Sequence, residues 1–164
     1  MKSIVLRCRK LLEQGRLKAY ESHKSGTPAM QVSTLLADVY DDVVLAIWNS
    51  AIEEHSNDQH AGGLSLVAHG GFGRRDLAPY SDADLMILAT RGSETLANKI
   101  AGNLTRDLAD SGITPGLSIR MPIEACRMSW SDPVIFSSLA ESRLIAGSLQ
   151  LYSCLLYTSD AADD

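Results

Sequence analysis

Two long stretches of the chain repeat their apolar positions at three- and four-residue steps, which is the spacing of an amphipathic helix. Residues from about Val5 to Ser22 predict a basic, moderately amphipathic helix, which the Ser-Gly-Thr-Pro segment at 25–28 ends. A stronger pattern from about Met30 to Glu54 predicts a longer helix with one buried face. The apolar positions of this face are Val32, Leu35, Leu36, Val39, Val43, Ile47 and Ala51. Together the two helices predict an N-terminal helical arm.

Three acidic residues, Asp38, Asp41 and Asp42, fall on or beside the opposite face of the second helix. A metal site is one interpretation of such a group. The polar face of an amphipathic helix ordinarily meets water, however. We therefore predict that these carboxylates form solvated surface.

The pattern changes after the polar, glycine-containing segment 55–63, where short apolar runs replace the helical period. Leu64–Ala68 runs into a glycine cluster and predicts a buried strand, and Asp84–Leu88 predicts a second strand. Leu117–Met121 alternates between apolar and polar residues and predicts a third strand, with Ser118 and Arg120 on its polar side.

Two further helices are expected around these strands. One runs from Ser93 to about Asp110, and the Asp132-Pro133 pair predicts the cap and first residue of a last helix that ends at Gly147. The order of elements predicts an α/β (α+β) fold in which helices flank a small mixed sheet. We place the helical arm at residues 1–58, the core at 59–128 and a C-terminal helix packed on the core at 129–153.

Composition narrows the class of protein. The chain has 164 residues, of which 45% are hydrophobic and 21% charged, as in an ordinary soluble domain. It has neither the apolar run of a membrane helix nor a signal-peptide core, so we expect no membrane partner and a cytoplasmic location. Cys8, Cys126 and Cys154 show no paired spacing and fit a reducing compartment. The formal charge of -5 argues against a broad nucleic-acid surface.

The last eleven residues, Cys154 to Asp164, resemble the translation of a transposase-type sequencing adapter. A short acidic terminus is the alternative interpretation. If the resemblance is correct, the natural sequence continues differently after about Ser153, and most of the acidic excess is an artefact. We therefore expect residues 154–164 to be foreign and the chain to be a fragment of a longer protein.

The candidate chemistry lies between the first two predicted strands. Gly70, Gly71 and Gly73 follow a strand directly, where glycines allow a positive φ and let backbone N–H groups approach phosphate oxygens. A tight turn without a ligand would use the same residues. The spacing matches neither a Walker A loop nor a clean GxGxxG motif.

Asp82 and Asp84 lie at the entry to the second strand. Residues two apart on a strand point to the same side, so both carboxylates are expected to converge. Two like charges repel unless a cation lies between them, and Mg²⁺ takes carboxylate and phosphate oxygens as ligands. An exposed Asp-x-Asp at a strand edge is the alternative, but the apolar residues that follow indicate a central strand.

Arg74 and Arg75 lie between the glycines and the aspartates. Arginine can clamp a triphosphate and stabilise charge on a transferred phosphoryl group. A surface ion pair with Asp76 is the alternative for either residue. For His69, which precedes the glycines, we favour a packed or hydrogen-bonded side chain over a catalytic one.

The combination is more specific than its parts. Two glycines, ten intervening residues and then Asp-x-Asp on a strand resemble the signature of the polymerase-β-like nucleotidyltransferase superfamily. Within it, the segment GGFGRRDLAPYSDADL at 70–85 resembles the form GGYGRGELxPxSDxDLL of PII-protein uridylyltransferases. Downstream, GLSIR at 116–120 and ESRLIAG at 141–147 resemble the GHSVR segment and the ESRLLxG helix of that family.

The resemblance implies Mg²⁺-dependent transfer of UMP from UTP to a tyrosine hydroxyl of the PII signalling protein, with release of pyrophosphate. It implies hydrolytic and ACT domains further along the family's chains. The implied site residues are Asp82 and Asp84 for metal and catalysis, and Gly70, Gly71, Gly73, Arg74 and Ser81 for nucleotide.

The sequence departs from the family at two points. Leu117 stands where the family often has histidine, and no Asp or Glu lies between Ser111 and Ile123, where a third carboxylate is common. Two carboxylates suffice, or another residue supplies the third ligand, or activity is weakened. A nucleotide-binding regulatory module of the same fold, without transfer activity, is therefore an alternative. A glutamine-synthetase-type adenylyltransferase is a second one.

Overall fold

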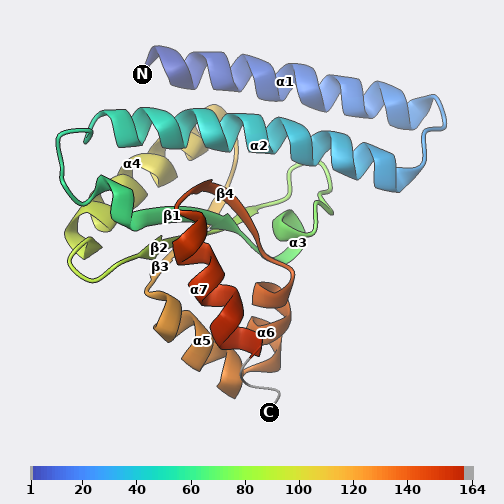
Figure 1. Ribbon diagram of the computed structural model, residues 1–164. Helices are drawn as coiled ribbons and strands as arrows, with labels where there is room; N and C mark the ends of the chain where they lie inside the picture. The colour runs from blue at the N-terminus through green and yellow to red at the C-terminus, as the bar shows by residue number, and fades with distance from the viewer. Residues whose placement is uncertain (1, 161–164) are drawn as a thin grey trace.

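The computed structural model describes residues 2–160 and arranges them in layers (Figure 1). Two long helices, α1 (Ser3–Lys24) and α2 (Ala29–Glu53), pack side by side along one side of the sheet. They confirm the two predicted helices to within about two residues at each end. The turn between them contains Gly26 at a φ of 90°, a conformation that glycine adopts without strain.

A four-stranded mixed sheet forms the centre, with strand order β3-β2-β1-β4. Its strands are β1 (Leu64–Ala68), β2 (Ala83–Ala89), β3 (Pro115–Arg120) and β4 (Arg143–Gly147). β1 is antiparallel to both β2 and β4, and β2 is parallel to β3. The predicted fold class and the three predicted strands are confirmed. The whole of β1 is buried, as its unbroken apolar run indicates.

Shorter helical elements connect and cover the strands. They are the 3₁₀ turn η1 (Ala61–Gly63), α3 (Gly70–Gly73), α4 (Glu94–Ser111), α5 (Pro122–Ser131), α6 (Pro133–Ala140) and α7 (Leu149–Asp160). α4 confirms the helix expected from Ser93 to Asp110, whereas α5 was not predicted. α7 continues past residue 153, where the foreign tail is expected to begin. The structure does not test whether residues 154–164 are foreign, so this stays a prediction. Residues 161–164 lie outside the described part.

The last predicted helix is wrong in its second half. Asp132 caps it as expected, because its carboxylate accepts a 2.8 Å hydrogen bond from the Val134 amide, but the helix ends at Ala140. Residues 143–147 instead form β4 along the outer edge of β1, where unpaired backbone groups would otherwise remain. Leu144 and Ile145 then pack into clusters on opposite faces of the sheet, as a strand requires.

The two faces of the sheet carry separate hydrophobic clusters. On one face, residues such as Leu66 and Ile87 pack with α2, α4 and the inner side of α1. On the other, Val67, Met86 and Leu88 pack against α5, α6 and α7, which lie on the far side of the sheet from α2 (Figure 1). Within residues 2–160, none of the helices combines the length and apolarity needed to cross a bilayer.

Candidate active site

Asp84 occupies the second position of β2 and is half-buried. A Cβ added at Gly70 or Gly116 would lie 2.9 Å from one of its carboxylate oxygens, so both glycines leave room for this side chain. Gly116 is the β3 partner of Asp84 in the parallel register, and Gly70 opens the α3 turn at a φ of 58°. The sheet and the glycine turn therefore converge on Asp84.

The other glycines of the turn are also close to backbone. A Cβ at Gly73 would lie 2.5 Å from the Glu141 carbonyl oxygen, and one at Gly71 would lie 3.4 Å from the Asp76 carbonyl oxygen. At Gly73 any side chain would clash with backbone that cannot easily move. This glycine thus allows α3 to pack against the segment that leads from α6 into β4.

Asp82 lies just before β2 and is exposed. The preceding turn is closed by two hydrogen bonds: the Ser81 amide donates to the Ala78 carbonyl at 3.1 Å, and the Ala78 amide donates to the Ser81 hydroxyl at 3.0 Å. The Ser81 side chain, expected from the resemblance to bind nucleotide, thus stabilises the loop in this structure. Its role toward a nucleotide stays a prediction.

The two arginines of the motif have different partners, and neither forms an ion pair with Asp76 in the described structure. Arg74 pairs with Glu141 at 2.6 Å, and both side chains are nearly half exposed, at 46% and 45%. An exposed pair of this kind contributes little to stability, so Arg74 can exchange Glu141 for a phosphate. Arg75 has a φ of 64° and points to α2, where it pairs with Asp38 and Asp41.

The prediction of solvated surface holds for Asp38, whose side chain is 64% exposed, but it is wrong for Asp41. Asp41 is only 23% exposed and accepts hydrogen bonds from Arg75 at 3.3 Å and from Arg143 of β4 at 2.6 Å. The same Arg143 nitrogen donates to the Phe72 carbonyl oxygen in the glycine turn at 3.2 Å. The polar face of α2 thus holds the turn in place, because basic residues from distant segments meet it after folding.

His69 is half-buried beside Asp84, and its amide donates to the Asp84 carbonyl oxygen at 3.1 Å. Its Nδ1 shares a 2.9 Å hydrogen bond with the Ser138 hydroxyl of α6, which confirms the expected hydrogen-bonded histidine. Burial lowers the pKa of His69 below its ordinary value, while the negative charge of Asp84 acts in the opposite direction. The ring is therefore neutral at neutral pH.

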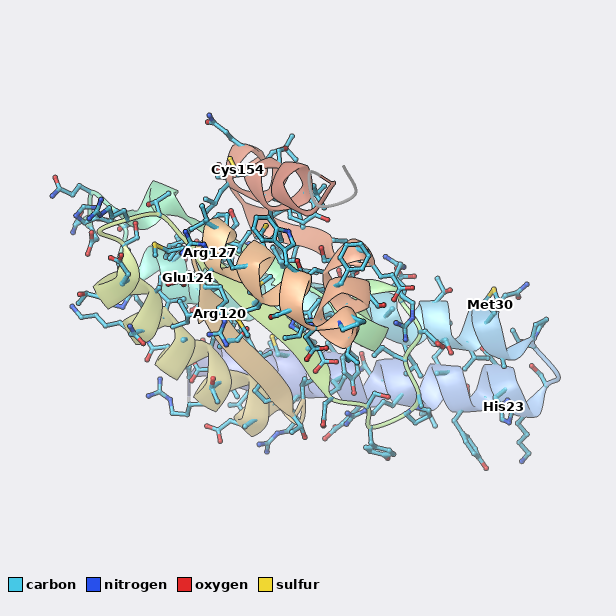
Figure 2. All side chains as sticks on the ribbon, turned by 90° about the horizontal axis from the view of Figure 1, so that it is seen from below. His23, Met30, Arg120, Glu124, Arg127 and Cys154 are labelled. Atoms are coloured by element: carbon cyan, nitrogen blue, oxygen red, sulfur yellow. The ribbon has the colours of Figure 1, made fainter. Side chains whose placement is uncertain are left out.

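A pocket of about 240 Å³ opens two residue pairs along the strands from Asp84. Met86 forms part of it, beside the Ser118 and Arg120 that the alternating pattern placed on the polar side of β3. His69 and Ser138 also line it, together with apolar residues of α5 and α6. Figure 2 views the molecule from below and shows Arg120 near Glu124 and Arg127 of α5. His23 and Met30 lie at the opposite end of the molecule, at the tip of the helical arm.

The donor set fits a hard divalent cation that also takes ligands from its substrate. Asp82 and Asp84 form no hydrogen bond or ion pair through their carboxylates within residues 2–160, so their oxygens are available. The same part of the chain has no group of three or more Asp, Glu, His or Cys side chains able to hold a metal. Mg²⁺ commonly binds one or two carboxylates together with substrate phosphates and water, which this site allows.

Sequence comparisons agree with the motif resemblance. No protein-family model matches the chain. Several curated proteins named bifunctional uridylyltransferase/uridylyl-removing enzyme are similar to it over most of its length. That of Methylococcus capsulatus is 28% identical over 92% of this chain, and that of Streptomyces coelicolor is 33% identical over 82%. That of Caulobacter vibrioides is 32% identical over 85%.

The chain corresponds to a small part of these relatives, since the matches span 17%, 15% and 15% of their respective lengths. Their names support a nucleotidyltransferase-family function for the matched region. The mixed α/β fold with its four-stranded sheet is consistent with a nucleotidyltransferase-like core.

Proposed function

Starting from this similarity to uridylyltransferases, we propose that the chain carries the nucleotidyl-transfer site of a cytoplasmic enzyme that moves UMP from UTP to a tyrosine hydroxyl of the PII signalling protein. The observation that carries the proposal is the convergence of the Gly70 turn, the Gly116 position of β3 and the Asp84 carboxylate. We limit the proposal to transfer because the chain spans so little of its bifunctional relatives.

In this proposal Asp82 and Asp84 hold Mg²⁺. The metal, when bound, neutralises charge on the nucleotide phosphates and makes the α-phosphorus more open to attack. The α3 turn and Arg74 bind the β- and γ-phosphates and orient pyrophosphate as the leaving group. The attacking tyrosine hydroxyl loses its proton to a carboxylate of the site, for which exposed Asp82 is the accessible candidate. Most of the rate enhancement would come from positioning and electrostatics.

The pocket beside Asp84 supports a small base. Its volume of about 240 Å³ is below the range of about 300–1,000 Å³ typical of whole drug-sized ligands, so it suits one ring rather than a complete nucleotide. Ser118, Arg120 and His69 provide polar groups around an apolar lining, which can pair with the carbonyl groups of a pyrimidine. We therefore favour UTP over ATP as donor.

One observation keeps a second candidate in view. Among the described residues, no third carboxylate joins Asp82 and Asp84. A nucleotide-binding regulatory module of the same fold, without transfer, would need only the binding part of this site.

The test is to measure UTP binding by calorimetry, with and without Mg²⁺, and incorporation of labelled UMP into a PII protein. The comparison is with the Asp82→Asn/Asp84→Asn double variant. We expect Mg²⁺-dependent binding and transfer by the wild type, and a loss of transfer of at least about a hundredfold in the variant. Binding of UTP without any transfer would favour the regulatory module, and absence of Mg²⁺-dependent binding would contradict both candidates.

A further inference from the structure

The two proposed metal ligands are supported very differently. Asp84 lies within a strand that is paired on both sides, and its carboxylate is confined between Gly70 and Gly116. Asp82 precedes the strand, is exposed, and has no hydrogen bond or ion pair through its side chain in the described part of the chain. The direction of the Asp82 carboxylate therefore depends on how its backbone is held.

One side chain from the helical arm holds that backbone. Tyr40 of α2 is fully buried, and its hydroxyl donates a 3.2 Å hydrogen bond to the Ser81 carbonyl oxygen. This carbonyl belongs to the peptide unit that joins Ser81 to Asp82, and a peptide unit is planar. Fixing the carbonyl therefore fixes the orientation of the peptide plane that contains the Asp82 nitrogen.

Arg16 of α1 holds Tyr40 in turn. Its Nη2 donates to the Tyr40 hydroxyl at 2.9 Å, so this hydroxyl accepts one hydrogen bond and directs its own proton to Ser81. The same nitrogen donates to the Gly112 carbonyl oxygen at 3.0 Å, just after α4. The guanidinium carbon also lies 4.5 Å from the centre of the Tyr80 ring in the loop. A single arginine thus connects the arm to the loop and to the end of α4.

Beside these contacts the loop borders open space. Residues of α1, α2 and 77–80 surround a pocket of about 680 Å³, which Arg16 and Tyr80 help to line. Tyr80 is 76% exposed, and its φ of 66° is unusual for a residue other than glycine. Where packing is incomplete, individual hydrogen bonds contribute more to local order.

Resting on the proposed function, we propose that Tyr40 is a positioning residue for the metal site. Its hydroxyl, held by Arg16, orients the Ser81–Asp82 peptide and so directs the Asp82 carboxylate toward the cation bound by Asp84. Tyr40 is too deeply buried to touch a nucleotide and acts only through Ser81. The helical arm is then part of the catalytic scaffold.

Tyr40→Phe is the sharpest test, because it removes the hydroxyl and leaves the buried ring. The hydrogen-bond energy at stake corresponds to about a threefold to tenfold rise in the Mg²⁺ concentration that half-saturates UTP binding. Tyr152→Phe is the matched control, since the Tyr152 hydroxyl also donates to a backbone carbonyl, that of Ser142, at 2.7 Å. We expect the control to leave the Mg²⁺ dependence unchanged.

Arg16→Met tests the second link. It should raise the Mg²⁺ requirement in the same direction, and the Tyr40→Phe/Arg16→Met double variant should be less affected than the sum of the single changes, because both act through one carbonyl. Additive effects would overturn the role of Arg16, and an unchanged Mg²⁺ requirement in Tyr40→Phe would overturn the whole inference while leaving the proposed function intact.

A measurement without nucleotide separates the two proposals. Amide hydrogen exchange in the peptide covering residues 78–83 should be faster in Tyr40→Phe than in the wild type and unchanged in Tyr152→Phe. If the wild type binds no UTP, the proposed function fails. If the exchange of this peptide is the same in all three proteins, the positioning role of Tyr40 fails.

Discussion

β2 sends alternate side chains to two unlike sides of the molecule. Leu85 and Ile87 enter the continuous core formed with α2 and α4, whereas Met86 and Leu88 meet α5, α6 and α7, where the packing leaves a pocket that reaches Met86. Asp84 shares the orientation of Met86 and so belongs to the side that contains the pocket. The close-packed face of the sheet therefore stabilises the fold, whereas the other face leaves space beside the acidic pair.

Truncating neighbouring residues of β2 should give the largest difference between the two faces. Ile87 is fully buried, so Ile87→Ala should lower the free energy of unfolding by about 2–5 kcal/mol. Met86→Ala should cost about 2 kcal/mol, the lower end of the same range, because it enlarges an existing pocket rather than opening a new cavity in close-packed surroundings. Urea unfolding of both variants measures the difference, and equal losses would show that the two faces are packed alike.

A smaller effect should follow from filling the space beside Asp84. Gly116→Ala puts a methyl group 2.9 Å from a carboxylate oxygen of Asp84, so the carboxylate must shift by a few tenths of an ångström. Because catalysis is sensitive to small misplacements, we expect UMP transfer to fall by about threefold to tenfold with little change in melting temperature. Gly102→Ala in α4 is the control, since nothing lies within 4 Å of its added Cβ. Equal activity of both variants and wild type would contradict the proximity argument.

The smallest expected difference concerns how readily the helices on each face of the sheet separate from it by local unfolding. Cys8 of α1 and Cys126 of α5 are both only 1% exposed, but they belong to the clusters on opposite faces of the sheet. The smaller cluster has fewer buried side chains to separate, so Cys126 should react with iodoacetamide about tenfold faster than Cys8 in the native protein. Peptide mapping by mass spectrometry gives both rates. Faster labelling of Cys8 would indicate that the arm, and not the α5–α7 side, opens first.

Sequence patterns predicted most of the local structure because they depend on neighbours in the chain. The three- and four-residue period of residues 30–54 is sufficient to define α2, and the apolar run at 64–68 matches β1 residue for residue. The glycines and the two aspartates could be recognised as one site because only ten residues separate the Gly70-Gly71 pair from Asp82. The roles of these residues toward metal and nucleotide remain predictions.

Structure that depends on partners distant in the chain could not be inferred from local sequence patterns. Residues 143–147 were expected to be helical, and only the free edge of β1 made them a strand. The polar face of α2 was expected to meet water, and only folding brought Arg143 to Asp41, 102 residues away in the chain. Tyr40 was not singled out by the sequence pattern, and only the folded structure brings its hydroxyl to the Ser81 carbonyl oxygen.

The sequence by itself therefore determined the order and kind of most elements, and the acidic and glycine residues of the candidate site, because periodicity and motif spacing are local properties. The tertiary structure alone decided which face of the sheet is closed, where the pocket lies beside Asp84, and how the helical arm reaches the loop before Asp82. Hydrogen bonds and ion pairs of this kind join segments tens of residues apart, and no local pattern encodes which buried donor will meet which carbonyl.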